Sequence, residues 1–415
     1  MAPIATSETV SDADIADLKE AVRAATLQHK GDFPLPPDGT LRRYKKAGID
    51  LSEGYPYVPK AALGGGVDRN QAARADEGSR DVAYVDPASR ADPEKKALLS
   101  AATKVDHLTQ HIGTEISGIQ LDSLTDQQKD ELALLAAERG VVFFRDQDLS
   151  PQAQKELGLY WGQGRVEVHP QAPQVPGQPG VLLIWEEGRP KNWGPSTRSH
   201  RLPYGGGHYG WHSDLSHEEF PPGYTHLYQD SVPVTGGDTL WASGYAAYDK
   251  LSPTFKKLIE GLNGIYRSAN VYPDPSKPNA APKPILRKHP LVRTHPVTGW
   301  KSLFVNRWWT VGIEGLDGPE ATIILDYLND VFERSTDIQV RWRWTPGTSA
   351  VWDNRVVNHT VSFDWVGDRH GTRVSSLGEK PFFDPNSKGR AESLSLEEWN
   401  GPDYDNFRFS QLGLQ

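Results

Sequence analysis

The sequence predicts a mainly β protein with helices inserted between the strands. Its 415 residues include 39 glycines and 32 prolines, a share above the average of about 12% for the two together. The chain also holds 13 tryptophans, 15 tyrosines and 12 phenylalanines, which suit the surfaces of sheets. Short apolar segments broken by turn residues dominate positions 220–385. Together these observations favour a loop-rich β fold over a helical bundle.

Several segments carry helical signals of capping and periodicity. One opens at Ser11 or Asp12, and another has a capping box formed by Thr125 and Gln128 ahead of an apolar run. The predicted helices span residues 11–30, from Thr125 to Gly140, from Ser150 with Pro151 at its first position, from Ser252 to Gly264, and 319–334. The strands are expected between these helices.

Two strand patterns are clear. Residues 141–144, VVFF, form a continuous apolar run that is typical of a fully buried strand. Residues 339–344, QVRWRW, alternate apolar side chains with Arg341 and Arg343, which predicts a half-buried strand with its arginines in solvent.

The chain divides into three parts by pattern. Residues 1–100 are an N-terminal extension, which consists of a helix followed by a Pro/Gly-rich sequence without periodicity. Residues 101–385 are the main domain, and residues 386–415 are a tail. A basic cluster in the extension, Arg42, Arg43, Lys45 and Lys46, is expected to be a solvated surface. The extension is predicted to cover a barrel edge, mediate assembly or stay partly disordered.

Composition excludes several functional classes. The net charge of -9 argues against nucleic-acid binding, which needs a basic field. The absence of cysteine excludes thiolate nucleophiles, iron–sulfur clusters and zinc sites that use Cys, so that a metal would need His and carboxylate ligands. No apolar stretch is long enough to span a membrane, and no signal peptide is evident. We therefore expect a cytoplasmic protein without a membrane or nucleic-acid partner.

One His-x-Asp triplet is a candidate for metal binding. His212 and Asp214 would point to the same face of a strand, where an imidazole and a carboxylate can converge. A third ligand from a distant strand would complete the facial triad that leaves three positions of an iron open. The candidates for it are His289, His295, His359 and His370.

Two arginines favour His359 among these candidates. Arg369 and Arg373 follow it, four residues apart, and would share one face of a strand. A guanidinium held inside a barrel needs an anion, and its fork suits a carboxylate. Two arginines beside an open metal site therefore indicate two anionic ligands, although an ordinary surface pair is the alternative.

Sequence blocks in the right order strengthen this interpretation. Three stretches follow the triplet in this order: PPGYTHLYQDSVPVTGGDTLWASGYAAYDKLSP, HPLVRTHPVTGWKSLFVN and QVRWRWTPGTSAVWDNRVVNH. They resemble the taurine/alpha-ketoglutarate dioxygenase (TauD/TfdA-like) family and its fungal sulfonate dioxygenase branch. The similarity runs from about Lys104 to Pro385.

The resemblance implies a double-stranded β-helix, the cupin-like jelly roll, and three cofactors or co-substrates: Fe(II), 2-oxoglutarate and O2. Each site residue is carried over from its own motif. The metal ligands would be His212, Asp214 and His359; the far carboxylate of 2-oxoglutarate would meet Arg369 and Thr239; and His169, Arg373 and Trp309 would contact the substrate. Whether Arg373 serves the substrate or 2-oxoglutarate stays open.

The resemblance also implies the reaction. A small anionic substrate, first of all an alkyl sulfonate, would be hydroxylated beside sulfur and collapse to sulfite and an aldehyde. The long segment 171–210 and the absence of the asparagine that meets the taurine amine make a substrate other than taurine the better fit. The alternatives are the same machinery acting on an amino acid or carboxylic acid in secondary metabolism, and a non-catalytic jelly-roll binding protein. A homo-oligomer is compatible with either.

Other polar residues receive secondary roles. His208 and His217 are candidates for contact with substrate or with a metal ligand. Asp353 and Asn354 are expected to tie a turn near the site, and three tryptophans are expected in the core: Trp211, Trp241 and Trp352.

Overall fold

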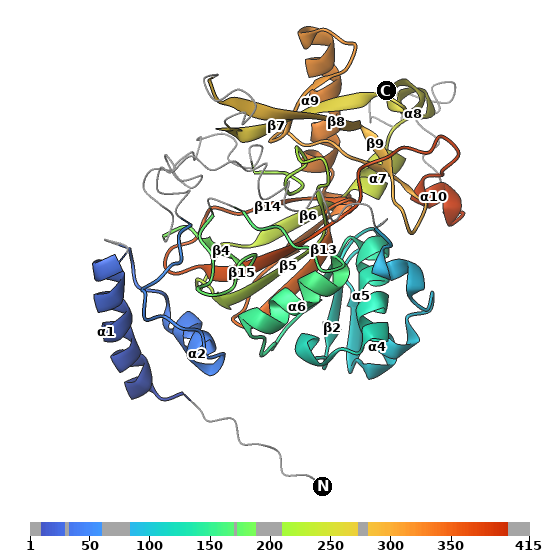
Figure 1. The fold of residues 1–415 in the computed structure, drawn as a ribbon. Helices are drawn as coiled ribbons and strands as arrows, with labels where there is room; N and C mark the ends of the chain where they lie inside the picture. The colour runs from blue at the N-terminus through green and yellow to red at the C-terminus, as the bar shows by residue number, and fades with distance from the viewer. Residues whose placement is uncertain are drawn as a thin grey trace, which may run out of the picture.

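The computed structural model describes most of the chain (Figure 1). The described residues are 10–29, 33–59, 84–169, 172–187, 210–272 and 281–396. Strands joined by loops dominate them, and helices are inserted between the strands. The mainly β class predicted from the sequence is therefore confirmed.

The larger sheet carries most of the long-range pairing. Among the described residues it has seven strands in the order β1-β2-β3-β13-β5-β15-β4, antiparallel except for β2 beside β3. Its strands are β1 (Lys104–His107), β2 (Thr114–Ser117), β3 (Val141–Phe144), β4 (Leu182–Trp185), β5 (Pro222–Ser231), β13 (Thr348–Asp353) and β15 (His370–Leu377). The VVFF run is β3 and is buried throughout, as predicted.

A smaller sheet faces the larger one. It orders β12 (Gln339–Trp342), β6 (Thr239–Ser243) and β14 (Val357–Val361) as antiparallel neighbours. Buried apolar residues of β3, β5 and β13 pack against those of this sheet in one cluster. Phe143 stacks on Trp342 with ring centroids 4.0 Å apart, while Arg341 and Arg343 point outward as predicted.

Helices cover the outer side of the larger sheet. They are α4 (Lys96–Ala101), α5 (Asp126–Arg139) and α6 (Pro151–Trp161), with short 3-10 turns at Pro87–Arg90 and Leu121–Ser123. Thr125 and Gln128 form the predicted capping box of α5, and Ser150 caps α6. Each capped start satisfies N–H groups that the first turn leaves without helical partners.

A further layer packs on the smaller sheet. It contains α7 (Gly244–Asp249), α8 (Pro253–Ile259), β7 (Asn263–Tyr272), β8 (Lys283–Pro290), β9 (Val292–Thr294), β10 (Lys301–Leu303), β11 (Thr310–Ile313), α9 (Gly318–Arg334) and a 3-10 turn at Thr336–Ile338.

The predicted end of α8 at Gly264 is wrong. The helix ends before Gly261, whose φ of +80° suits glycine, and Gly264 belongs to β7.

The described part of the extension packs tightly against the larger sheet. It contributes α1 (Asp12–His29) and α2 (Asp38–Lys46), which lie beside β4 and β15 (Figure 1). α2 was not foreseen. The basic cluster that includes Arg43 was expected to lie in solvent, and for Arg43 this is wrong. Its side chain is 7% exposed, and its Nη1 lies 3.2 Å from Oδ2 of Asp230 on β5.

A buried ionic network ties residues 84–90 to the centre. Arg355 is 1% exposed and donates to both carboxylate oxygens of Asp353 at 2.7 and 2.6 Å. It also pairs with Asp86 and with Glu379. Asp353 is therefore structural, as predicted.

The remaining described helix, α10 (Arg390–Ser393), lies in the predicted tail. Within the described ranges, no helix combines the length and apolarity that crossing a membrane requires.

Candidate active site

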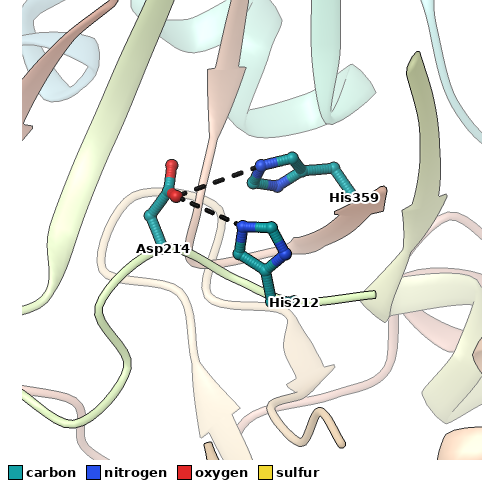
Figure 2. A group of neighbouring side chains, drawn as sticks. All are labelled: His212, Asp214 and His359. Atoms are coloured by element: carbon teal, nitrogen blue, oxygen red, sulfur yellow. Dashed lines mark ion pairs between the residues drawn. The ribbon is translucent and has the colours of Figure 1, made fainter. Parts of the chain in front are cut away.

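Three side chains converge as the sequence predicted. Ligand atoms of His212, Asp214 and His359 all lie within 4.8 Å of one another, and Figure 2 shows both rings turned toward the carboxylate. Oδ1 of Asp214 is 3.5 Å from Nε2 of His212 and 4.0 Å from Nε2 of His359. Two imidazole nitrogens and a carboxylate oxygen thus face one point.

Backbone pairing brings the two histidines together. His212 exchanges both backbone hydrogen bonds with His359 of β14, at 2.9 and 2.8 Å. The strand predicted to run through Asp214 is absent, because the chain turns directly after this single bridge. The carboxylate approaches the histidines from that turn and not from a strand face.

Asn354 holds the turn in place. Its carbonyl oxygen accepts from the Ser213 hydroxyl at 2.6 Å, and its side-chain oxygen accepts from Nε1 of Trp352 at 3.0 Å. Nε1 of Trp309 donates to the Ser213 carbonyl at 3.0 Å from the other side. The structural role predicted for Asn354 is confirmed, and hydrogen bonds to Ser213 hold the turn that carries Asp214.

Electrostatics keep two members of the triad, Asp214 and His359, in their ligating protonation states. Burial disfavours the charged carboxylate, but Arg373 and both histidines outweigh it and hold the pKa of Asp214 well below its ordinary value. Burial, and then His212, lower the pKa of His359 to about 3. An ionised carboxylate and a neutral imidazole are the forms that coordinate a metal.

The residues present fit a metal. Nδ1 of His212 donates to the carbonyl of Gly210 at 2.7 Å, which leaves Nε2 as a lone-pair donor toward Asp214. Oδ2 of Asp214 and Nδ1 of His359 are buried and lack a hydrogen-bond partner within the described residues. Two nitrogens and one carboxylate with open positions are the ligand set of non-haem Fe(II) oxygenases.

Arg373 lies against this triad. It projects from β15, and its Nη1 is 2.8 Å from Oδ1 of Asp214, while Nη2 lies 4.0 Å from Glu167. The Arg373 side chain is 18% exposed. Sequence reasoning did not single out Glu167, although it stands two residues before His169 in the same extended segment.

Arg369 lines a pocket of about 380 Å³ that His212 also lines. Its Nε donates to the carbonyl of Gly237 at 3.0 Å. Burial lowers the pKa of Arg369 to about 10, against the opposing influence of Glu187 and Asp238, so the group is a cation at neutral pH. The rest of the lining is mainly apolar: Pro173, Leu183, Ile184, Trp185, Glu186, Gly210, Trp308, Val361, Phe363 and Trp365.

Thr239 is buried at the start of β6, which pairs with β14. Its hydroxyl oxygen accepts a 2.9 Å hydrogen bond from Nε1 of Trp344. The hydroxyl proton is therefore left to donate elsewhere. Trp344 is a supporting residue that the sequence indicated only as an alternating apolar position.

The other predicted contacts occupy different places. His169 is half-buried, and its Nδ1 accepts from the backbone N–H of Ala172 at 3.0 Å. Trp309 packs with the ring of His217 behind the turn at Ser213, whereas its neighbour Trp308 lines the pocket and lies 5.6 Å from the His212 ring. His208 lies outside the described residues.

The rejected candidates for the third ligand are engaged elsewhere. His289 bonds to the carbonyl of Glu218 at 2.8 Å, His295 to Asp353 at 3.0 Å, and His370 to Asp230 at 2.7 Å. Trp211, Trp241 and Trp352 are buried in the core, as predicted.

The fold and this site define a non-haem Fe(II) oxygenase with a 2-His-1-carboxylate metal centre. The family model described as taurine catabolism dioxygenase TauD, TfdA family matches residues 104–375. The chain belongs to this family, and it is an Fe(II)- and 2-oxoglutarate-dependent dioxygenase that uses O2. The enzymatic relatives argue against the alternative of a non-catalytic binding protein.

Individual relatives agree with the family. A Schizosaccharomyces pombe protein whose name assigns it as an alpha-ketoglutarate-dependent sulfonate dioxygenase is 39% identical over 317 residues, covering 76% of this chain and 79% of its own. The alpha-ketoglutarate-dependent dioxygenase cnsP of Penicillium expansum is also 39% identical, over 72% and 81%. A crystal structure of a taurine dioxygenase from Burkholderia xenovorans superimposes with a TM-score of 0.56 at 28% identity, over 69% and 94%.

Proposed function

We propose that this dioxygenase hydroxylates an alkyl sulfonate at the carbon that bears sulfur. The observation that carries the proposal is the pair of arginines that flank the triad, Arg369 in the pocket with His212 and Arg373 on Asp214. Two arginine side chains at separate places beside one metal site suit two different anions. The sulfonate dioxygenase name of the Schizosaccharomyces pombe relative supports a sulfonate as the second anion.

The roles divide along this pair. Arg369 and the Thr239 hydroxyl would bind the far carboxylate of 2-oxoglutarate, whose keto-acid head faces His212, Asp214 and His359. Arg373 would bind the sulfonate, with His169 as a second donor. Trp308, which lines the pocket beside His212, would serve as the aromatic wall in place of Trp309. Iron, when bound, supplies the activation of O2 that this chain's side chains cannot supply.

The reaction balances as follows. One oxygen atom of O2 enters succinate as 2-oxoglutarate loses CO2, and the other becomes a hydroxyl on the carbon beside sulfur. The resulting hydroxysulfonate breaks its C–S bond, and the products are an aldehyde and sulfite. The Arg373 guanidinium would favour this outcome by placing the sulfonate, and hence its neighbouring carbon, next to the metal.

The two sheets are proposed to form a double-stranded β-helix within residues 101–385. A substrate other than taurine stays a prediction. We place the enzyme in the cytoplasm. Homo-oligomer formation stays a prediction, which sedimentation velocity of the full chain tests.

An anaerobic titration followed by a substrate panel tests the proposal. Adding Fe(II) and then 2-oxoglutarate should produce the visible charge-transfer band of a chelated keto acid. Once O2 is admitted, alkyl sulfonates should yield succinate and sulfite in equal amounts. Arg373→Gln should raise the KM for the sulfonate more than that for 2-oxoglutarate. Succinate formed only with amino acids or carboxylic acids, without sulfite, would establish the alternative in secondary metabolism.

A further inference from the structure

The N-terminal segment reaches the residue that follows Arg369. His370 is fully buried at the start of β15, and its two ring nitrogens have different partners. Nδ1 lies 2.7 Å from Oδ1 of Asp230 on β5, and Nε2 lies 2.6 Å from the hydroxyl of Tyr55. Consecutive residues of an extended chain point to opposite sides, so Arg369 faces the pocket while His370 faces the N-terminal segment.

The ionised state of Asp230 fixes the direction of the first of these bonds. Burial opposes ionisation of Asp230, but His370 and Arg43 prevail and hold its pKa below the ordinary value. Burial raises the pKa of Tyr55 well above its ordinary value, so the hydroxyl keeps its proton. The Nδ1–H of His370 therefore donates to the carboxylate, while Nε2 and the Tyr55 hydroxyl share the second hydrogen bond. The same hydroxyl lies 3.3 Å from the hydroxyl of Tyr44.

Two residues of α2 complete the arrangement. Thr40 donates to Oδ1 of Asp230 at 2.7 Å. Arg43 bonds to Oδ2 of Asp230 at 3.2 Å and to the hydroxyl of Thr372 on β15 at 2.8 Å. Two residues of β15 that follow Arg369, His370 and Thr372, are thus held through the N-terminal segment.

The backbone at this point needs such support. The pairing of β15 with β5 shifts register between His370 and Gly371, so that Asp230 has no direct partner across the ladder. A bulge of this kind redirects neighbouring side chains. A Cβ at Gly371 would lie 2.4 Å from the carbonyl oxygen of Tyr228, and the close approach therefore requires glycine.

A second contact reaches the pocket wall. The ring of Tyr55 lies 5.5 Å from that of Trp185, which lines the pocket and lies 5.5 Å from His370. Tyr55 therefore touches both a wall of the pocket and the neighbour of its cation.

We propose that Tyr55 is a positioning residue for 2-oxoglutarate: through His370 it sets the direction from which Arg369 meets the far carboxylate. This inference rests on the proposed function, in which Arg369 binds that carboxylate. It makes the N-terminal segment part of the co-substrate site and not an appendage to the catalytic domain.

Binding measurements on the full chain test the proposal. Tyr55→Phe removes one hydroxyl and keeps the ring; Tyr245→Phe is the matched control, because Tyr245 is equally buried and its hydroxyl donates to the Ala137 carbonyl at 3.1 Å. Mn(II)-loaded protein is titrated by calorimetry with 2-oxoglutarate and with 2-oxopentanoate. The second ligand has the same keto-acid head but lacks the far carboxylate.

Tyr55→Phe should weaken 2-oxoglutarate binding about 5–10-fold, the value of one lost hydrogen bond, and leave 2-oxopentanoate and Mn(II) binding unchanged. Tyr245→Phe should change none of the three. Equal weakening of both keto acids, or no weakening of either, would overturn the inference. If circular dichroism shows that Tyr55→Phe does not fold, Thr40→Val carries the test, with about a threefold loss restricted to 2-oxoglutarate.

Arg369→Gln separates this inference from the function on which it rests. The variant should lose the preference of the wild type for 2-oxoglutarate over 2-oxopentanoate. A wild type without that preference, or a variant that keeps it, would overturn the role of Arg369 itself. If Arg369→Gln loses the preference while Tyr55→Phe keeps it in full, only the role of Tyr55 fails.

Discussion

Arg373 and Asp214 form a direct ion pair, with Nη1 of the arginine 2.8 Å from Oδ1 of the carboxylate. The same carboxylate oxygen faces both histidines of the triad. The arginine proposed to bind substrate thus also neutralises a metal ligand, so the charge of the site depends on both a metal ion and a substrate anion.

This pair predicts how stability depends on metal. Arg373→Gln leaves Asp214 buried without its cation, which should lower the free energy of unfolding of metal-free protein by about 3 kcal/mol. Bound Mn(II) should reduce the difference in unfolding free energy between variant and wild type, because the ion then neutralises the Asp214 carboxylate. Chemical denaturation with and without Mn(II) measures both values. Arg341→Gln, which removes an exposed pair with Asp238, should cost less than about 1 kcal/mol in either state. A metal-independent loss in Arg373→Gln would contradict the prediction.

The third metal ligand can be tested against a rejected candidate. His359→Ala should reduce Mn(II) affinity by more than the roughly 10–100-fold that loss of a merely supporting residue causes. His289→Gln should bind the metal normally, since His289 bonds to the Glu218 carbonyl at 2.8 Å. Calorimetric titration with Mn(II) provides the comparison, and equal effects of the two substitutions would refute the assignment.

Trp344 should support 2-oxoglutarate binding from a distance. Its Nε1–H occupies the Thr239 oxygen and leaves the hydroxyl proton for the co-substrate. Trp344→Phe should therefore raise the dissociation constant of 2-oxoglutarate about fivefold. Trp342→Phe is the control, because the Trp342 Nε1 is buried without a hydrogen-bond partner in the described part of the chain. Similar losses in both variants would point to general packing.

His226 predicts an acid-sensitive fold. Burial, and then Arg43, lower its pKa to about 3 from the ordinary 6.5. Between pH 6.5 and about 3, His226 therefore binds a proton in the unfolded chain but not in the folded protein. The free energy of unfolding falls as the pH falls through this range. His226→Gln should abolish about 1.5 kcal/mol of the loss between pH 6.5 and 5.0, because one pKa unit corresponds to about 1.4 kcal/mol. Urea unfolding of metal-free protein at both pH values measures it. Identical losses in both proteins would be inconsistent with a neutral buried His226.

Two of the three metal ligands and the capped helices could be predicted because short stretches of sequence encode them. The triplet of His212 and Asp214, the capping box at Thr125 and the run at Val141–Phe144 each lie within a few residues. Asp214 nevertheless lies in a turn, since a single β-bridge and not a continuous strand holds His212.

The support of the site could not be predicted in this way. Tyr55 meets His370, and Arg43 meets Asp230, across 315 and 187 residues respectively. Hydrophobic periodicity carries no information on pairings between residues so far apart. The helix α2, which carries Arg43, could not be predicted because the sequence around it is rich in proline and glycine. The bulge before Gly371 depends on the partner strand and leaves no local signal.

The separation of Tyr55 from His370 also has a consequence for biosynthesis. A ribosome that adds about 5–20 residues per second needs roughly 15 to 60 s to translate the 315 residues between them. Throughout that interval the apolar faces of α1 and α2 have been made while β15, against which they pack, has not. The nascent chain must keep this surface from aggregating until β15 has been made, and a product truncated before Arg369 would lack both arginines of the site together with the strand against which its N-terminal helices pack.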